Sequence, residues 1–308
     1  MRLDKQLHHR KPEVLAYYRS RAEESLAEIT RSVGSHDFRR RASAINKEIQ
    51  VTCDRLIASL RQEAEAENWP RDEALSNILM LSYCSSVVMI EFRNAVWPYE
   101  YMAFSRRIGE RWERFCALCF EHPARDDVRL FVPPLFSEVR NRLTQEIRDY
   151  VGALPLTEEQ RSELLRYYDK VWGLVTSGEI KLELDVHTQV EDVKYVIDLK
   201  SGFGSNEKGN TNRLLLVASI YKNLEEENYR CLMLVRQKED ENNHYLLTLK
   251  NSRLWEVHCG EDAYEAMRGL SGFDIAQWVH NYIDWHDDLS PETLHYLQSQ
   301  DLTHYLKW

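Results

Sequence analysis

The chain has 308 residues, 43% of them hydrophobic and 29% charged, which is too apolar for disorder and long enough for a sizeable core. No uninterrupted apolar run approaches the roughly 18 residues that span a membrane, and the charged start lacks the apolar centre of a secretory signal, so we expect neither. Forty Lys and Arg against fifty Asp and Glu give a net charge of −10, which weighs against a uniformly basic nucleic-acid-binding surface.

The first half of the chain is helical in pattern. Apolar residues recur every three or four positions in six segments: 11–33, 36–66, 71–93, 97–121, 134–150 and 157–175. Gly34, Pro70 and Pro98 punctuate the breaks, and Thr157 with Gln160 fits a capping box. We therefore predict six helices before the first strand.

The six cysteines are scattered rather than densely spaced. Cys116 and Cys119 form a CxxC with His122 just beyond, but no second ligand pair follows at matching spacing, and the run reads as helix. We expect buried free thiols rather than a zinc site, and a reduced, cytoplasmic compartment.

The pattern changes near Gly178. Strict alternation predicts a strand over 181–187, a polar turn follows near Glu191, and further segments predict strands over 194–200, 230–236 and 244–250, with a loop over 201–210 and a helix over 211–228. The run 230–236 is apolar throughout, as in a strand inside a sheet. Short, aromatic-rich helices follow from residue 261. The order indicates an α+β or mixed α/β core.

Pairing the first two of these strands as a hairpin brings three charged side chains onto one polar surface. The two-residue period places Asp185 on that face of the first strand, and Asp198 and Lys200 on that face of the second. A pair of carboxylates suits a hard cation such as Mg²⁺, for which Mn²⁺ can substitute. The alternative is an exposed hairpin face whose charges form solvated cross-strand pairs.

The spacing of these residues resembles the PD-(D/E)xK nuclease superfamily, which includes many restriction endonucleases. Asp185 precedes Asp198-Leu199-Lys200 by thirteen positions. The resemblance implies a restriction-endonuclease-like mixed sheet flanked by helices, with metal ligands at Asp185, Asp198 and the Leu199 backbone carbonyl. It implies that Lys200 serves the nucleophile. Leu184 stands where the named motif has proline, and Asp198 where glutamate is commoner.

Many members of that superfamily also carry a helix in which a glutamate follows a glycine by four residues. Gly109 and Glu113 have this spacing, which places both on one helix face, and Glu110 is the competing acid. The resemblance implies that Glu113 reaches the metal site. A solvated helix-surface acid is the alternative.

Several residues are candidates for nucleic-acid contact. The loop after the second strand carries small polar residues and Lys208, which suit close approach to phosphate, and the helix behind it resembles the helix behind the family's catalytic hairpin. His187 shares the face of Asp185, although an ordinary strand histidine is the more usual explanation. The candidate set is Ser201, Asn206, Lys208, Asn210, Asn212, Arg213, Lys222, Arg39, Arg40 and Arg106. The alternative explanation for the arginines is that they lie on ordinary solvated helix faces.

Three regions follow from these patterns: residues 1–95 for recognition or dimerisation, a catalytic core over 96–260 with a helical insertion at 123–175, and acidic helices over 261–308. The expected function is a metal-dependent endonuclease that hydrolyses double-stranded DNA as a homodimer, of the type II restriction or another anti-phage defence type. A non-catalytic binding module on a degenerate nuclease fold, or a nuclease for RNA or repair intermediates, remains an alternative.

The uneven distribution of charge fits a polyanionic partner better than the net value does. Residues 1–60 carry twelve Lys and Arg against eight Asp and Glu, whereas residues 261–308 carry two against nine. We expect the C-terminal helices to face away from the substrate.

Overall fold

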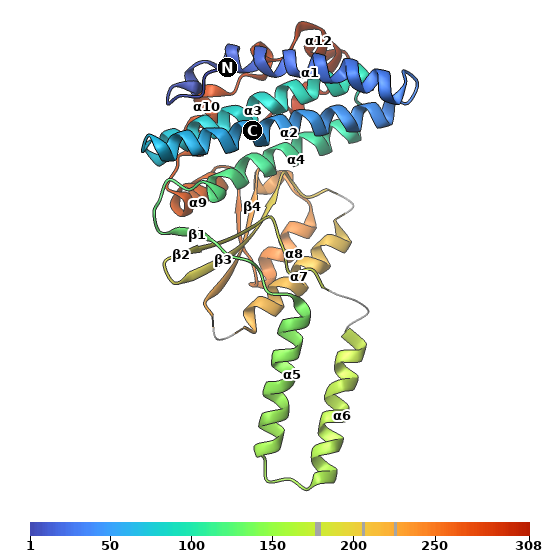
Figure 1. The fold of residues 1–308 in the computed structure, drawn as a ribbon. Coiled ribbons are helices and arrows are strands. Elements are labelled where there is room, and N and C mark those ends of the chain that lie inside the picture. Colours follow the sequence, from blue (N-terminus) through green and yellow to red (C-terminus); the bar gives the residue numbers. More distant parts are fainter. Residues whose placement is uncertain (176–179, 205–206, 225–226) are drawn as a thin grey trace.

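The computed structural model describes residues 1–175, 180–204, 207–224 and 227–308. Its elements form a layer of long helices, a sheet beneath it, and a helical arm that projects from the far side of the sheet (Figure 1). The arrangement is an α+β fold with a mixed sheet, as the sequence predicts.

Four long helices form most of the helical layer: α1 (Lys11–Val33), α2 (Phe38–Ala66), α3 (Arg71–Val96) and α4 (Tyr101–Glu121). They confirm the predicted helices, with one visible shift at the start of α4. Trp97 precedes Pro98 and has an extended backbone, because a residue before proline is forced out of the helical region. Helix α4 therefore begins at Tyr101 rather than at residue 97.

Helix α3 is the centre of this layer and contacts α1, α2 and α4. It is long and apolar enough to cross a membrane, which corrects the expectation that no segment would be. However, 94% of its most apolar stretch is buried inside the fold, as in a core helix of a soluble protein.

The sheet has five strands in chain order: β1 (Val128–Leu130), β2 (Val186–Val190), β3 (Val193–Lys200), β4 (Tyr229–Val235) and β5 (Glu256–Cys259). Pairing is antiparallel from β1 to β3 and parallel from β3 to β5, so the sheet is mixed. The apolar segment predicted to lie inside the sheet does so as β4.

Two hydrophobic clusters cover opposite faces of this sheet. Ile197 and Leu199 of β3 pack into the cluster that contains α3 and α4, whereas Val196 packs into the cluster with α7 (Lys208–Lys222) and α8 (His244–Ser252). Asp198 and Lys200 share the parity of Val196, so their side chains leave β3 toward the α7 side.

Two strand predictions need correction, and two strands were missed. The strand predicted over 181–187 begins only at Val186, because the ladder with β3 starts there, although burial still alternates through Leu182 and Leu184. The segment 244–250 is helix α8 rather than a strand: the Asn243 side chain caps it, and short apolar runs do not distinguish the two. Strands β1 and β5 were not predicted, since three or four residues carry too little pattern.

Within the predicted insertion of residues 123–175, α5 (Phe136–Ala153) and α6 (Glu158–Val175) form the projecting arm, whereas β1 belongs to the sheet (Figure 1). Thr157 and Gln160 make the predicted capping box: the Gln160 amide donates to the Thr157 hydroxyl, and the Thr157 amide donates to the Gln160 side chain. Residues 176–179, including Gly178, lie outside the described residues.

The C-terminal segments return to the helical layer. They are α9 (Glu261–Ser271), α10 (Ile275–Tyr282), α11 (Trp285–Asp288) and α12 (Pro291–Ser299), and short 3₁₀ turns occur at η1 (Leu7–His9), η2 (Glu239–Glu241) and η3 (Thr303–Tyr305). The buried Asp288 carboxylate accepts hydrogen bonds from Lys11 Nζ at 2.8 Å and from the Tyr83 hydroxyl at 2.7 Å. The two ends of the chain thus share one core with α3.

Candidate active site

The β2–β3 hairpin sets the position of Asp185 relative to β3. Val186 pairs with Ile197, and one further step in this antiparallel register places Asp185 opposite Asp198. The backbone hydrogen bonds between β2 and β3 have ended at this point. Instead, an Asp185 carboxylate oxygen accepts a hydrogen bond from the Leu199 N–H at 2.8 Å. This bond fixes the exposed carboxylate beside the end of β3.

Asp198 is buried within the sheet. Only 1% of it is exposed, because β2 and β4 flank β3 on both sides. Lys200, two residues on and therefore on the same face, brings its ammonium to 3.4 Å from Asp198 Oδ2. The same oxygen has no well-directed hydrogen bond, so the contact is a loose ion pair that leaves a buried carboxylate oxygen unsatisfied.

Helix α4 contributes the third acid. A β-carbon at Gly109 would lie 2.5 Å from Ser201 Oγ, so only glycine lets α4 pack this closely on the residue after β3. One turn later, Glu113 lies near enough to feel the charges of Lys200, Asp185 and Asp198. We call Glu113, Asp185, Asp198 and Lys200 the carboxylate–lysine site.

The pKa values of this site reflect burial and crowding of acids. Burial raises the pKa of Glu113 to about 7, an effect that Lys200 opposes and Asp185 supports. Burial likewise raises the pKa of Asp198 to about 6 against the opposing charge of Lys200. Burial alone would lower the pKa of Lys200, but Asp198 and Glu113 outweigh it, so this pKa lies above its ordinary value.

The structure separates the two glutamates that compete for the site. Glu110 is held on the outer side of α4 by Arg106 at 2.8 Å and Arg107 at 3.0 Å. Glu113 instead faces the end of β3. The spacing of four from Gly109 therefore identifies the acid that meets the hairpin.

The predicted nucleic-acid residues fall into three places. Ser201 lies at the site, and the first two turns of α7 carry Lys208, Asn210, Asn212 and Arg213, of which Arg213 is close enough to lower the pKa of Asp198. Lys222 is the last residue of α7, about 20 Å along the helix from its start, so it is not brought to the site. Asn206 lies outside the described residues.

Arg39, Arg40 and Arg106 are exposed on the helical layer. Arg39 and Arg40 lie in the first turn of α2, where the Asp37 side chain accepts the Arg40 N–H. Arg106 is on α4, three residues before Gly109, with its side chain 82% exposed. Arg106 thus borders the site, whereas the α2 pair lies on the neighbouring helix.

His187 has a structural environment. It is buried, its Nε2 accepts the Leu184 N–H at 2.9 Å, and its ring lies edge-on to Phe131. Burial lowers its pKa to about 4, so the imidazole is neutral at physiological pH. The structure gives it no contact with the acids.

Two residues that the sequence pattern did not single out hold the loop after β3. Asn242 Oδ1 accepts the Phe203 N–H at 2.7 Å, and the Gln237 N–H donates to the Ser201 carbonyl at 3.3 Å. The adjacent asparagines at 242 and 243 were the available signal, since asparagine side chains commonly bond to nearby backbone groups.

The donor types fit a hard cation, although the acids are not preassembled as a closed cage. Within the described ranges, no group of three or more His, Cys, Asp or Glu is close enough to hold a metal ion. Mg²⁺ needs fewer, since it commonly uses one or two carboxylates with water and substrate phosphate. Asp185, Asp198 and the Leu199 carbonyl offer such a set, and Asp198 Oδ2 makes no well-directed hydrogen bond beyond its loose ion pair with Lys200.

The CxxC cysteines are core residues, as expected. Cys116 and Cys119 are free and buried in α4, and burial raises the pKa of both thiols. Both therefore stay protonated thiols, which are poor zinc ligands.

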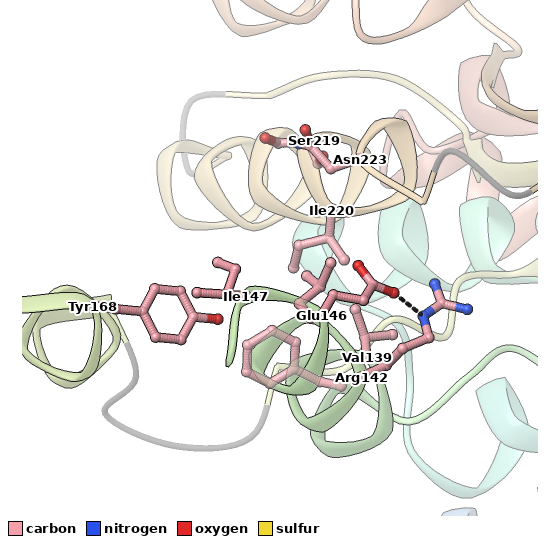
Figure 2. Close-up of a pocket in the computed structure, with 10 residues that line it drawn as sticks. Val139, Arg142, Glu146, Ile147, Tyr168, Ser219, Ile220 and Asn223 are labelled. Atoms are coloured by element: carbon pink, nitrogen blue, oxygen red, sulfur yellow. Dashed lines mark hydrogen bonds and ion pairs between the residues drawn. The ribbon is translucent and has the colours of Figure 1, made fainter. Parts of the chain in front are cut away.

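A cavity of about 660 Å³ lies elsewhere, at the root of the arm between α5, α6 and α7 (Figure 2). Val139, Ile147 and Ile220 give it an apolar lining, and Arg142 and Glu146 form an ion pair at 3.7 Å on its rim. The cavity lies at the C-terminal end of α7, whereas the acids of the carboxylate–lysine site lie near the N-terminal end of this helix. The cavity is therefore separate from the carboxylate–lysine site.

Comparison of the chain with protein-family models, with curated proteins and with solved structures finds no match.

Proposed function

We propose that the chain is a Mg²⁺-dependent endonuclease that hydrolyses phosphodiester bonds of DNA, of the restriction or another defence type. One observation carries the proposal: α4 packs on the hairpin through Gly109, so that Glu113 joins Asp185, Asp198 and Lys200 from two distant parts of the chain. Solvated cross-strand pairs would not need a buried Asp198 or a helix held against Ser201.

Asp185, Asp198 and the Leu199 carbonyl are the residues that would hold Mg²⁺ or Mn²⁺, with Glu113 beside them. The bound cation supplies Lewis-acid polarisation of the phosphodiester and lowers the pKa of water. The protein contributes fixed oxygen donors, since the Leu199 N–H holds the Asp185 carboxylate in place.

Lys200 acts as a cation in this proposal. Its pKa lies above the ordinary value, so the ammonium remains protonated at neutral pH. A fixed positive charge at the end of β3 stabilises negative charge that develops on the phosphate and orients the attacking water by hydrogen bonding. Deprotonation of water is therefore assigned to other groups.

Duplex DNA is the proposed substrate, with a homodimer to match the two-fold symmetry of a double-strand cut. The basic first turn of α2, Arg106 and Arg107 in the second turn of α4, and the start of α7 support a polyanion near the site. The free, buried cysteines are compatible with the reduced cytoplasm that we propose as the compartment.

Incubation of the purified protein with plasmid and Mg²⁺, followed by sequencing of the ends, tests the proposal. We expect cleavage by the wild type, none in chelator, and none by Asp198→Ala or Lys200→Ala variants that remain folded. Cleavage that persists in both variants would refute the assignment. Calorimetry that detects no metal binding, with tight DNA binding in chelator, would instead support a non-catalytic module.

A further inference from the structure

Three guanidinium groups surround one buried hydroxyl where α3 ends and α4 begins. Arg93 stacks on the Tyr99 ring, with its Cζ 4.0 Å from the ring centroid. Burial raises the pKa of Tyr99, and the charges of Arg107, Arg93 and Arg111 all oppose that rise, so all three lie close to its hydroxyl. We call Arg93, Tyr99, Arg107 and Arg111 the arginine cluster.

The positive charge of the arginine cluster is not balanced. In the ranges that the structure describes, neither Arg93 nor Arg111 has a carboxylate oxygen within 4.0 Å. The Glu110 carboxylate forms ion pairs with both Arg107 and Arg106. Arg93 donates to the Trp97 carbonyl and Arg111 to the neutral Gln50 side chain at 2.9 Å. Buried cations are usually paired, but Arg93 and Arg111 have no direct carboxylate partner, and Glu100 and Glu110 act on them only from a longer distance.

Two buried polar atoms of the cluster lack a well-directed hydrogen bond. Arg111 Nε makes no hydrogen bond, and the Tyr99 hydroxyl, on a residue only 2% exposed, makes none with good geometry, although Arg107 lies close enough to interact with it. Both atoms can donate a hydrogen bond to an anion. The cluster reaches the surface at Arg107, whose side chain is 28% exposed, and at its partner Glu110, whose side chain is 36% exposed.

We propose that the arginine cluster binds a phosphate of the DNA backbone, an inference that rests on the nuclease function proposed above. The planar fork of arginine matches phosphate oxygens, and the incoming phosphate replaces Glu110 as the partner of Arg107. Arg107 and Glu113 are six residues apart on α4, about 9 Å along the axis. That distance is well within one turn of a duplex, but the two side chains leave α4 about 120° apart, so a bound duplex contacts both sites by passing round the helix.

The test measures binding of a labelled 30-base-pair duplex between 50 and 200 mM salt, with every variant made in an Asp198→Asn background. Arg107→Gln and Arg111→Gln should each weaken binding about tenfold and lower the slope of log affinity against log salt by about one. Arg268→Gln on the acidic α9, whose side chain is 54% exposed, is the matched control and should change neither.

Tyr99→Phe separates binding from structure. Its hydroxyl makes no well-directed hydrogen bond in the free protein, only a close approach to Arg107, so the variant should change the melting temperature little yet bind the duplex more weakly. If Arg111→Gln does not fold, Arg107→Gln and Tyr99→Phe still decide the outcome.

The results also separate this inference from the nuclease proposal. If Arg107→Gln and Tyr99→Phe leave the affinity and the salt slope unchanged, the phosphate site is overturned. If the wild-type protein, which keeps Asp198, still cleaves DNA with Mg²⁺, the nuclease proposal stands. A lower slope of log affinity against log salt in these variants, together with no DNA cleavage by the wild type, would support the phosphate site and refute the nuclease.

Discussion

Gly109 of α4 packs against Ser201 so closely that a β-carbon would lie 2.5 Å from the serine hydroxyl oxygen. This contact joins the helical layer to the end of β3 and sets the distance between Glu113 and the hairpin acids. Everything proposed for the carboxylate–lysine site depends on it.

Gly109→Ala should therefore destabilise the protein, although alanine normally favours a helix. The new methyl group forces α4 from β3, at a cost of about 1–3 kcal/mol in unfolding free energy measured with urea. Gly152→Ala, in α5 with open space around it, is the control and should stabilise by up to about 1 kcal/mol. A second change, Ser201→Gly, should restore most of the loss; equal losses with and without it would contradict the contact.

The pKa of Glu113 makes stability depend on pH in the metal-free protein. Its folded pKa of about 7 lies above the ordinary 4.5, so the stabilisation is present below pH 4.5 and is lost as pH rises through 7. The shift corresponds to roughly 3 kcal/mol at most. Urea unfolding in chelator should show this fall, and Glu113→Gln should reduce it to the part that Asp198, with its pKa of about 6, contributes. The same slope in Glu113→Gln would place the titration on another group.

Lys200→Met should lower the unfolding free energy of the metal-free protein at pH 8 by about 3 kcal/mol, because it leaves Asp198 and Glu113 as buried charges without their cation. At pH 5 the loss should shrink, since both carboxyls then take up protons. Lys250→Met breaks an exposed pair with Glu239 and should leave stability nearly unchanged. Comparable losses in the two variants would mean that the Lys200 pair is not buried.

His187 should remain neutral well below the usual range for histidine. Its pKa of about 4, lowered by burial, means that stability is present above pH 6.5 and is lost as pH falls toward 4. An NMR titration of the imidazole measures this directly. A midpoint near 6.5 would show that the ring is solvated and reopen its candidacy as a site residue.

The sequence pattern predicted what depends on local periodicity. The two-residue period placed Asp198 and Lys200 on one face, and the helical period placed Glu113 on the face of Gly109, because both follow from backbone geometry alone. The choice of Glu113 itself came from the resemblance to the nuclease superfamily. The burial of Asp198 was not predictable in this way, since it depends on β4 and α7 packing around β3. The strand predicted over 244–250 was wrong because its apolar run suits either a strand or a helix. The Asn243 side chain caps this segment, which is helix α8.

The arginine cluster also escaped prediction. Arg107 and Arg111 are one turn apart on α4, a spacing that reads as a solvated helix face. Only the packing of α4 on α3 brings Arg93 and the Tyr99 hydroxyl to the same place. Tertiary contacts between segments therefore supply the part of the site that periodicity does not.

The central claim is that the carboxylate–lysine site cleaves DNA, and a matched pair of variants tests it most directly. We would measure the single-turnover rate of cleavage of a plasmid-derived duplex at saturating Mg²⁺ for the wild type, Asp185→Asn and Glu183→Gln. Glu183 is an exposed acid two residues from Asp185, with no part in the proposed site. We predict that Asp185→Asn loses at least about a hundredfold in rate while Glu183→Gln keeps the wild-type rate. Equal rates in the two variants, or no cleavage by the wild type, would contradict the claim.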